Sequence, residues 1–209
     1  MMKKMKKLYT IGHSTAPFED FIGRLKKYHI TCVVDVRSIP YSKFANVYDS
    51  TYLKGMLYTH DISYVYMGKE FGARQEEVYY NSEGKLDFKL YQKSSRFQRG
   101  VRRIEDGLQK GYNIVFMCTE KDPIDCHRTI MVAQYFFSQG YSIGNIMMDG
   151  SLQEQEEIEE RLLDLYFPER KELNLFELLD GKRGREDYIK EAYYKRNIAI
   201  GYGLDMEEK

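Results

Sequence analysis

The chain carries short apolar runs that alternate with longer segments in which apolar residues recur at helical spacing. The runs are rich in β-branched residues, which is typical of strands buried on both faces of a sheet. They predict strands at residues 8–11, 31–36, 62–67, 113–118 and 143–148. The helical spacing predicts helices that begin near Pro17, span about 93–110 and 126–139, and follow Ser151.

Three of these predicted helices start at residues that commonly cap a helix. Ser14 or Thr15 is expected to cap the first helix, and Asp125 the helix over about 126–139. Ser151-Leu-Gln-Glu154 has the spacing of a capping box, in which each side chain bonds the backbone of the other residue. This pattern predicts that Cys126 occupies a first helical position, where free N–H groups create a positive potential.

Strand–helix–strand units of this length predict an α/β fold with a mostly parallel sheet and helices on both faces. We therefore expect a three-layer α/β/α, Rossmann-like architecture in a single domain over residues 1–209, with its core at about 8–167. Residues 168–209 are more polar and are expected to form a helical C-terminal extension, with helices at 173–179 and around 186–195. Residues 41–58 and 73–85 are expected to form short helices or functional loops.

Composition narrows the class of protein. The 209 residues include 32 basic and 32 acidic side chains, and this balance weakens the case for coating nucleic acid or a membrane through bulk charge. The apolar runs are far shorter than the roughly 20 residues that a membrane-spanning helix needs, and the start lacks a secretory segment. Three Cys, without the spacing of a disulfide framework, favour a reduced protein in the cytoplasm.

Reactive residues stand where three of the predicted strands end. In an open α/β sheet, ligands bind outside the carboxyl ends of the strands, so these side chains are expected to meet at one rim. The candidate residues are His13, Ser14, Asp35, Arg37, Cys118, Glu120, Cys126, His127 and Arg128.

The first functional hypothesis is an enzyme that acts on an anionic, phosphate-bearing or nucleotide-like small molecule. Cys118 or Cys126 would act as nucleophile or redox thiol, with Cys126 the more reactive, and His13 or His127 as acid and base. Arg37, Arg128 and Ser14 would hold the substrate, and Asp35 and Glu120 would orient the bases. The alternative is structural: Cys118 packs in the core, and the two Arg form ion pairs with Asp35 and Glu120.

A metal site is a second interpretation of the same residues. Cys118, Cys126 and His127 could ligate a metal ion, with His13 as a fourth ligand, but the chain lacks the close Cys-x-x-Cys pair that is usual in zinc sites. A phosphate loop and the Gly-x-Gly-x-x-Gly fingerprint are also missing from the sequence. No cofactor is therefore predicted.

The second functional hypothesis is a module that binds or processes nucleic acid. Between Lys85 and Lys110, eight basic residues stand against three acidic ones, and Tyr91 and Phe97 could stack on bases. The simpler interpretation of the helix over 93–110 is a solvated charged face. A third hypothesis is an interaction protein that uses the acidic helix at 154–165 as its contact surface.

Three motifs, in the same order, resemble the uncharacterised family named domain of unknown function 488. They are Thr10-Ile-Gly-His-Ser14, Asp35-Val-Arg-Ser-Ile-Pro40 and Cys118-Thr-Glu…Cys126-His-Arg128. The stretch Ala192-Tyr193…Ile198-Ala199 is similar to the end of that family, and Tyr64 and Gly68 match its middle loosely. The resemblance spans nearly the whole chain. It implies a single α/β domain with the three motifs grouped at one site, and it implies no particular reaction.

Overall fold

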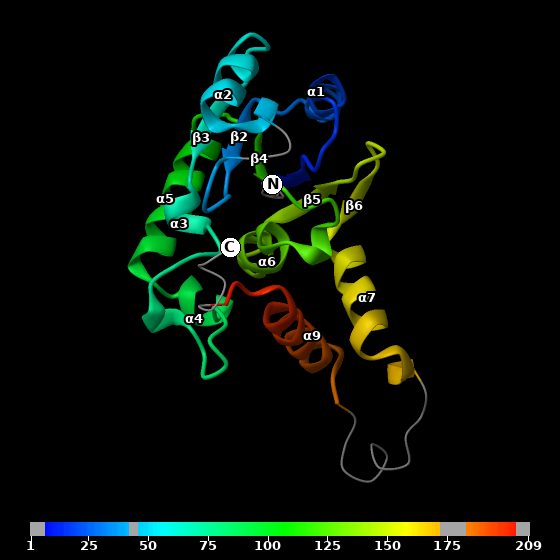
Figure 1. Ribbon diagram of the computed structural model, residues 1–209. Helices are drawn as coiled ribbons and strands as arrows, with labels where there is room; N and C mark the ends of the chain where they lie inside the picture. Colours follow the sequence, from blue (N-terminus) through cyan, green and yellow to red (C-terminus); the bar gives the residue numbers. More distant parts are fainter. Residues whose placement is uncertain (1–6, 42–45, 172–182, 204–209) are drawn as a thin grey trace.

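A six-stranded sheet forms the centre of the protein in the computed structural model, which describes residues 7–41, 46–171 and 183–203 (Figure 1). Its strands are β1 (Lys7–Gly12), β2 (Cys32–Asp35), β3 (Ser63–Tyr66), β4 (Ile114–Cys118), β5 (Ser142–Ile146) and β6 (Leu152–Glu154). Their order is β3-β2-β4-β1-β5-β6, and every neighbouring pair is parallel except β5 and β6. The predicted mostly parallel sheet is confirmed.

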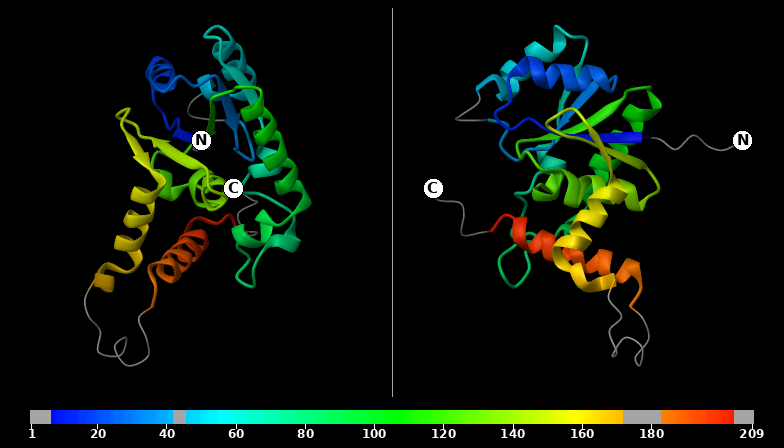
Figure 2. Two further views of the ribbon diagram at one scale, coloured as in Figure 1. Left: turned by 180° about the vertical axis from the view of Figure 1, so that it is seen from behind. Right: turned by 90° about the vertical axis from the view of Figure 1, so that its right-hand side faces the viewer.

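Helices cover both faces of the sheet (Figure 2). On one face, α1 (Phe18–Lys27) and α2 (Ser50–Tyr58) pack through residues such as Phe21 and Leu53. On the other face lie α5 (Ser95–Gln109) and α6 (Gln134–Ser138), together with the shorter α3 (Gly68–Phe71) and α4 (Phe88–Gln92). The three-layer α/β/α prediction is therefore confirmed.

The C-terminal part continues the second helical layer. Helix α7 (Gln155–Tyr166) lies beside α9 (Arg185–Ile200), and both contribute to the same core cluster as α5 and α6. A short turn of 3₁₀ helix, Pro168–Lys171, follows α7, and the helix expected at 173–179 lies outside the described residues. Within the described ranges, no helix combines the length and apolar character needed to cross a bilayer.

Side-chain alternation along the buried strands decides which face each functional residue meets. Successive residues of a strand point to opposite faces. Val33 packs with α1 and α2, so Asp35, two positions later, points to the same side. Phe116 and Cys118 of β4 pack with α5 and α6 on the other side. Asp35 and Cys118 therefore end neighbouring strands but face opposite layers.

The strand order also places a topological switch point between β1 and β4. These strands are neighbours, with Gly12 opposite Cys118. The chain leaves β1 toward β2 through α1 on one face, and leaves β4 toward β5 through α6 on the other face. In α/β proteins, ligands bind at the carboxyl edge where connections depart to opposite faces in this way.

The three predicted helix caps differ from the structure. Helix α1 begins at Phe18 after an extended Pro17, without a side-chain cap, and Ser14 adopts a left-handed conformation with φ of 50°. Asp122, not Asp125, forms a cap, because its carboxylate accepts from Ile124 at the start of the 3₁₀ turn Pro123–Asp125.

The predicted positions of Cys126 and Ser151 are therefore wrong. Cys126 has extended backbone angles, φ −135° and ψ 137°, and precedes the π-helix Arg128–Ala133, which leads into α6. The capping box of α7 is formed by Glu154 and Glu157. Ser151 lies outside it because residues 152–154 pair with β5 as the edge strand β6.

Candidate functional site at the carboxyl edge of the sheet

Four reactive side chains meet at the end of β4. One ligating atom from each of Cys118, Glu120, Cys126 and His127 lies within 4.8 Å of the others. The Nδ1 atom of His127 is 3.9 Å from the Sγ atoms of both Cys118 and Cys126. Cys126 Sγ donates to Glu120 Oε2 at 2.8 Å. We call these four residues the rim cluster.

The loop between β4 and the π-helix is folded back so that both cysteines face each other. The carbonyl of Cys126 accepts from the N–H groups of Thr129 and Ile130 at the start of the π-helix. Arg128 is fully buried and donates to the carbonyls of Glu120 and Lys121, so it holds the loop against the helix. Single turns of π-helix are rare and are frequent at functional sites.

Burial and mutual contact set the protonation of the thiols. Burial alone would raise the pKa of Cys126, but the hydrogen bond from Cys118 and the charges of Arg128 and His127 lower it well below the ordinary value. Burial and the same contact with Cys126 raise the pKa of Cys118 well above it. The proton of Cys126 is therefore the easier of the two to remove.

Contact with Cys126 also shifts the pKa values of His127 and Glu120. Burial opposes the charged imidazolium, but contact with Cys126 outweighs it and raises the pKa of His127. Burial and the nearby Cys126 charge raise the pKa of Glu120. Although Glu120 is exposed as a residue, its carboxyl group faces the buried sulfur. Both nearby groups can thus carry a proton to or from the Cys126 sulfur.

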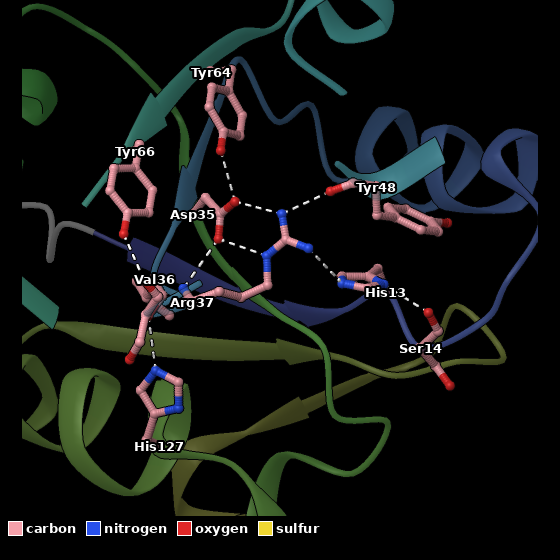
Figure 3. A network of polar contacts seen from close by, with 10 residues as sticks. His13, Ser14, Asp35, Val36, Arg37, Tyr48, Tyr64, Tyr66 and His127 are labelled. Atoms are coloured by element: carbon pink, nitrogen blue, oxygen red, sulfur yellow. Dashed lines mark hydrogen bonds and ion pairs between the residues drawn. The ribbon is translucent and has the colours of Figure 1, made fainter. Parts of the chain in front are cut away.

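A second network lies on the α1 side of the same edge (Figure 3). Arg37 forms a two-pronged ion pair with Asp35, through Nε at 2.9 Å and Nη2 at 2.6 Å. Its Nη2 also donates to the carbonyl of Tyr48, and its Nη1 lies 3.2 Å from His13 Nε2. Tyr64 donates its hydroxyl to Asp35 Oδ2 at 2.7 Å. Most donors of Arg37 are therefore used inside the protein.

His13 is held as a neutral imidazole in this network. Its Nδ1 lies 2.7 Å from the carbonyl of Ser14 and donates to it, which leaves Nε2 to accept from Arg37. Its ring stacks on Tyr48 with centroids 4.1 Å apart. Burial, and secondly the positive charge of Arg37, lower the pKa of His13 to about 4.

Backbone contacts join the two networks. The N–H groups of His13 and Ser14 donate to the carbonyls of Cys118 and Thr119, so the β1–β4 pairing continues two residues past the strands. His127 Nε2 lies 3.0 Å from the carbonyl of Val36, beside Arg37. The structure thus brings all nine predicted candidate residues to one edge, in two groups that face different layers.

Two buried guanidinium groups at this edge have unsatisfied donors. Arg24 of α1 donates to the carbonyl of Gly12, but its Nε and second Nη have no partner, and neither has the Nε of Arg128. Neither side chain forms an ion pair in the described part of the chain. Burial lowers the pKa of Arg24, and the nearby charge of Arg128 adds to this effect. The region beside Gly12 therefore has an excess of buried positive charge.

The sequence interpretation did not identify four groups that shape the site. Arg24 and the ring of Tyr48 were overlooked, as were the Tyr64 hydroxyl as a partner of Asp35 and the Val36 carbonyl. Only Arg24 carried a usable signal, because it stands three residues after Phe21 on the apolar stripe of α1. A charged residue on a buried stripe needs a polar partner.

The basic helix α5 shows the expected amphipathic pattern. Phe97, Val101 and Ile104 are buried, whereas Arg99 and Arg102 are exposed and form no ion pair with another described residue. Arg103 is paired with the nearly buried Glu70 of α3, and so supports the packing of these two helices.

The fold and site define an α/β protein with a polar, thiol-containing cluster at the carboxyl edge of its sheet. The profile of the family described as "Domain of unknown function DUF488" matches residues 17–135, which is more than half of the chain. The chain belongs to this family. No curated protein and no solved structure shows a significant match to this chain.

Proposed function

We propose that this protein is an enzyme whose reaction centre is the rim cluster and whose substrate is a small anionic, phosphate-bearing molecule. The observation that carries the proposal is the meeting of two thiols, an imidazole and a carboxyl group within 4.8 Å at the carboxyl edge of the sheet. Such a group is costly to bury for packing alone. Nucleophile, proton carrier and carboxyl group in mutual contact are the parts that group-transfer and hydrolytic chemistry require.

Within this proposal, Cys126 supplies the electron-rich atom. As a thiolate it can attack an electrophilic centre or coordinate a metal ion. Glu120, 2.8 Å away, and His127, 3.9 Å away, are placed to hold or move the proton. Contact with Cys118 lowers the pKa of Cys126 and so favours its deprotonated form.

The buried arginines support the anionic character of the substrate. Arg24 and Arg128 present unsatisfied N–H donors, and a buried charge without a partner is destabilising by several kcal/mol. A phosphate or carboxylate group bound beside Gly12 would satisfy them. Arg37, already bonded to Asp35, is assigned a positioning role with His13, because it holds the loop after β2 against the loop after β1.

We also propose that the thiols are reduced in the working enzyme. Cys32, Cys118 and Cys126 are free cysteines. A reaction centre that depends on a thiolate needs a reducing compartment, so we place the enzyme in the cytoplasm.

Alkylation of the reduced, chelator-treated protein tests this function. We expect iodoacetamide to label Cys126 faster than Cys32, as quantified by peptide mass, and inorganic phosphate or pyrophosphate to slow the reaction at Cys126. Potassium chloride at equal ionic strength is the salt control. Arg24→Gln should weaken the protection by phosphate, whereas the matched surface variant Arg99→Gln should leave it intact. Equal labelling rates with and without phosphate would exclude an anion site at the cluster.

A further inference from the structure

We propose that Cys118, Cys126 and His127 hold a Zn²⁺ ion, with its fourth position open beside Glu120. The inference deepens the proposed function, on which it rests for any reaction, by naming a metal cofactor for the same cluster. Two sulfurs and one imidazole nitrogen are the ligand types that zinc prefers, and three protein ligands with an open position are typical of catalytic zinc.

The separations between the ligand atoms fit one zinc ion. With Zn–S of about 2.3 Å and Zn–N of about 2.0 Å, tetrahedral ligands stand roughly 3.5 to 3.8 Å apart. His127 Nδ1 is 3.9 Å from each sulfur, and all the ligand atoms lie within 4.8 Å of one another. The two nitrogen–sulfur separations are therefore within a few tenths of an ångström of those in a zinc site, and the widest separation in the cluster exceeds them by at most about 1 Å.

The surroundings of His127 orient it as a ligand. Its Nε2 lies 3.0 Å from the carbonyl of Val36 and donates to it, so Nδ1 is directed at the two sulfurs. A metal-bound histidine usually donates its other ring N–H to a carbonyl or carboxylate, which fixes the ring and strengthens the ligand. In this protein that partner comes from the end of a neighbouring strand and is set by the sheet itself.

Glu120 is placed beside the open position instead of among the three ligands. The 2.8 Å contact between Cys126 Sγ and Glu120 Oε2 is a proton-sharing distance, shorter than the separation of two ligands on one zinc ion. Coordination by both sulfurs would release the protons of Cys118 and Cys126 to solvent and leave the carboxyl group next to the fourth position. There it can bond a metal-bound water molecule or give way to the substrate anion.

Metal analysis of the whole protein tests the inference. The protein is produced with zinc present, kept reduced and dialysed, and we expect one zinc per chain. Replacement of zinc by Co²⁺ should produce the intense visible bands of a tetrahedral site and a thiolate-to-cobalt charge-transfer band. Cys126→Ser and His127→Gln should lower the Co²⁺ affinity by at least about 100-fold. Cys32→Ala, at a buried thiol outside the cluster, should leave it unchanged.

A second measurement uses only the wild-type protein, so its result does not depend on whether the variants fold. In the wild-type protein, Zn²⁺ should protect Cys118 and Cys126 from alkylation, and Mg²⁺ should not. Absence of stoichiometric metal, a cobalt spectrum without the thiolate band, or a Cys118–Cys126 disulfide formed in place of metal binding would overturn the inference. If phosphate still slows labelling of Cys126 in that case, the proposed function survives alone. If metal binds but phosphate has no effect on the metal-free protein, the proposed function fails and the zinc site stands.

Discussion

His127 donates through Nε2 to the carbonyl of Val36 at 3.0 Å, across the edge of the sheet. The two residues are 91 positions apart in the chain, yet this bond decides which ring nitrogen faces the thiols. Since β2 and β4 are neighbouring strands, the loop that follows one is anchored on the end of the other. The rim cluster therefore depends on the pairing of these strands as well as on its own loop.

The neutral His13 predicts a specific loss of stability in acid. Its folded pKa of about 4 lies below the ordinary 6.5, so the unfolded chain takes up a proton over this interval and the native protein does not. The stabilisation that neutral His13 contributes to the free energy of unfolding is complete above pH 6.5. It is lost as the pH falls toward 4, by at most about 3 kcal/mol. We expect urea denaturation to show a steeper decline between these pH values in wild type than in His13→Gln. Parallel curves would contradict a buried neutral imidazole.

Gly12 is predicted to be intolerant of a side chain. A Cβ atom at this position would lie 2.0 Å from the carbonyl of Glu120 and 3.1 Å from a guanidinium nitrogen of Arg128. Gly12→Ala should therefore destabilise the protein by about 2 kcal/mol or more and disturb the rim cluster. The matched control is Gly23→Ala in α1, where an added Cβ meets nothing within 4 Å, and which should stabilise by up to about 1 kcal/mol. Similar denaturation midpoints for both variants would refute the close approach of β1 to the Glu120 loop.

The Asp35–Arg37 ion pair is predicted to be structurally essential. The two side chains are 0% and 4% exposed, so Arg37→Gln leaves a buried carboxylate uncompensated and should cost roughly 3–5 kcal/mol. Arg96 and Glu76 form a comparable pair at the surface, with side chains 40% and 59% exposed, and Arg96→Gln should cost less than about 1 kcal/mol. The comparison is made by chemical denaturation at neutral pH. Equal costs would show that Asp35 has another compensating partner.

The exposed face of α5 is predicted to contribute little to stability. Arg99→Gln combined with Arg102→Gln should change the free energy of unfolding by less than about 1 kcal/mol, because both side chains are exposed. Binding of a labelled oligonucleotide is measured on the same variant over a range of salt concentrations. We expect the variant to bind the oligonucleotide as the wild type does at every salt concentration. Such a loss would favour the nucleic-acid module over the small-molecule enzyme.

The central strands and the position of the site were predictable because they follow from local composition. The β-branched runs at β2 and β4 are typical of buried strands. Asp35 and Cys118 stand where those runs end. A parallel sheet then brings the strand ends to one edge. Strand order was not predictable, because pairing between β4 and β1 joins segments about a hundred residues apart, and periodicity contains no such information.

The errors occurred where two local signals competed. Asp122 and Asp125 both suit a helix start, and Pro123 decided between them, since its fixed φ favours the first position of the turn that Asp122 caps. At Ser151, pairing of Leu152 with Ile146 extended the sheet and shifted the helix start by one turn. The first of these differences changes the environment of Cys126: its pKa is lowered by contact with Cys118, Arg128 and His127 and not by a first helical turn.

The most direct test of the functional centre is a crystal structure of the reduced protein grown with Zn²⁺ and phosphate, with diffraction data collected at the zinc absorption edge. We predict an anomalous peak bounded by Cys118 Sγ, Cys126 Sγ and His127 Nδ1, and a phosphate in contact with the unsatisfied donors of Arg24 and Arg128. A structure with neither metal nor anion at the rim, and with the two thiols packed only against their neighbours, would contradict the proposed reaction centre.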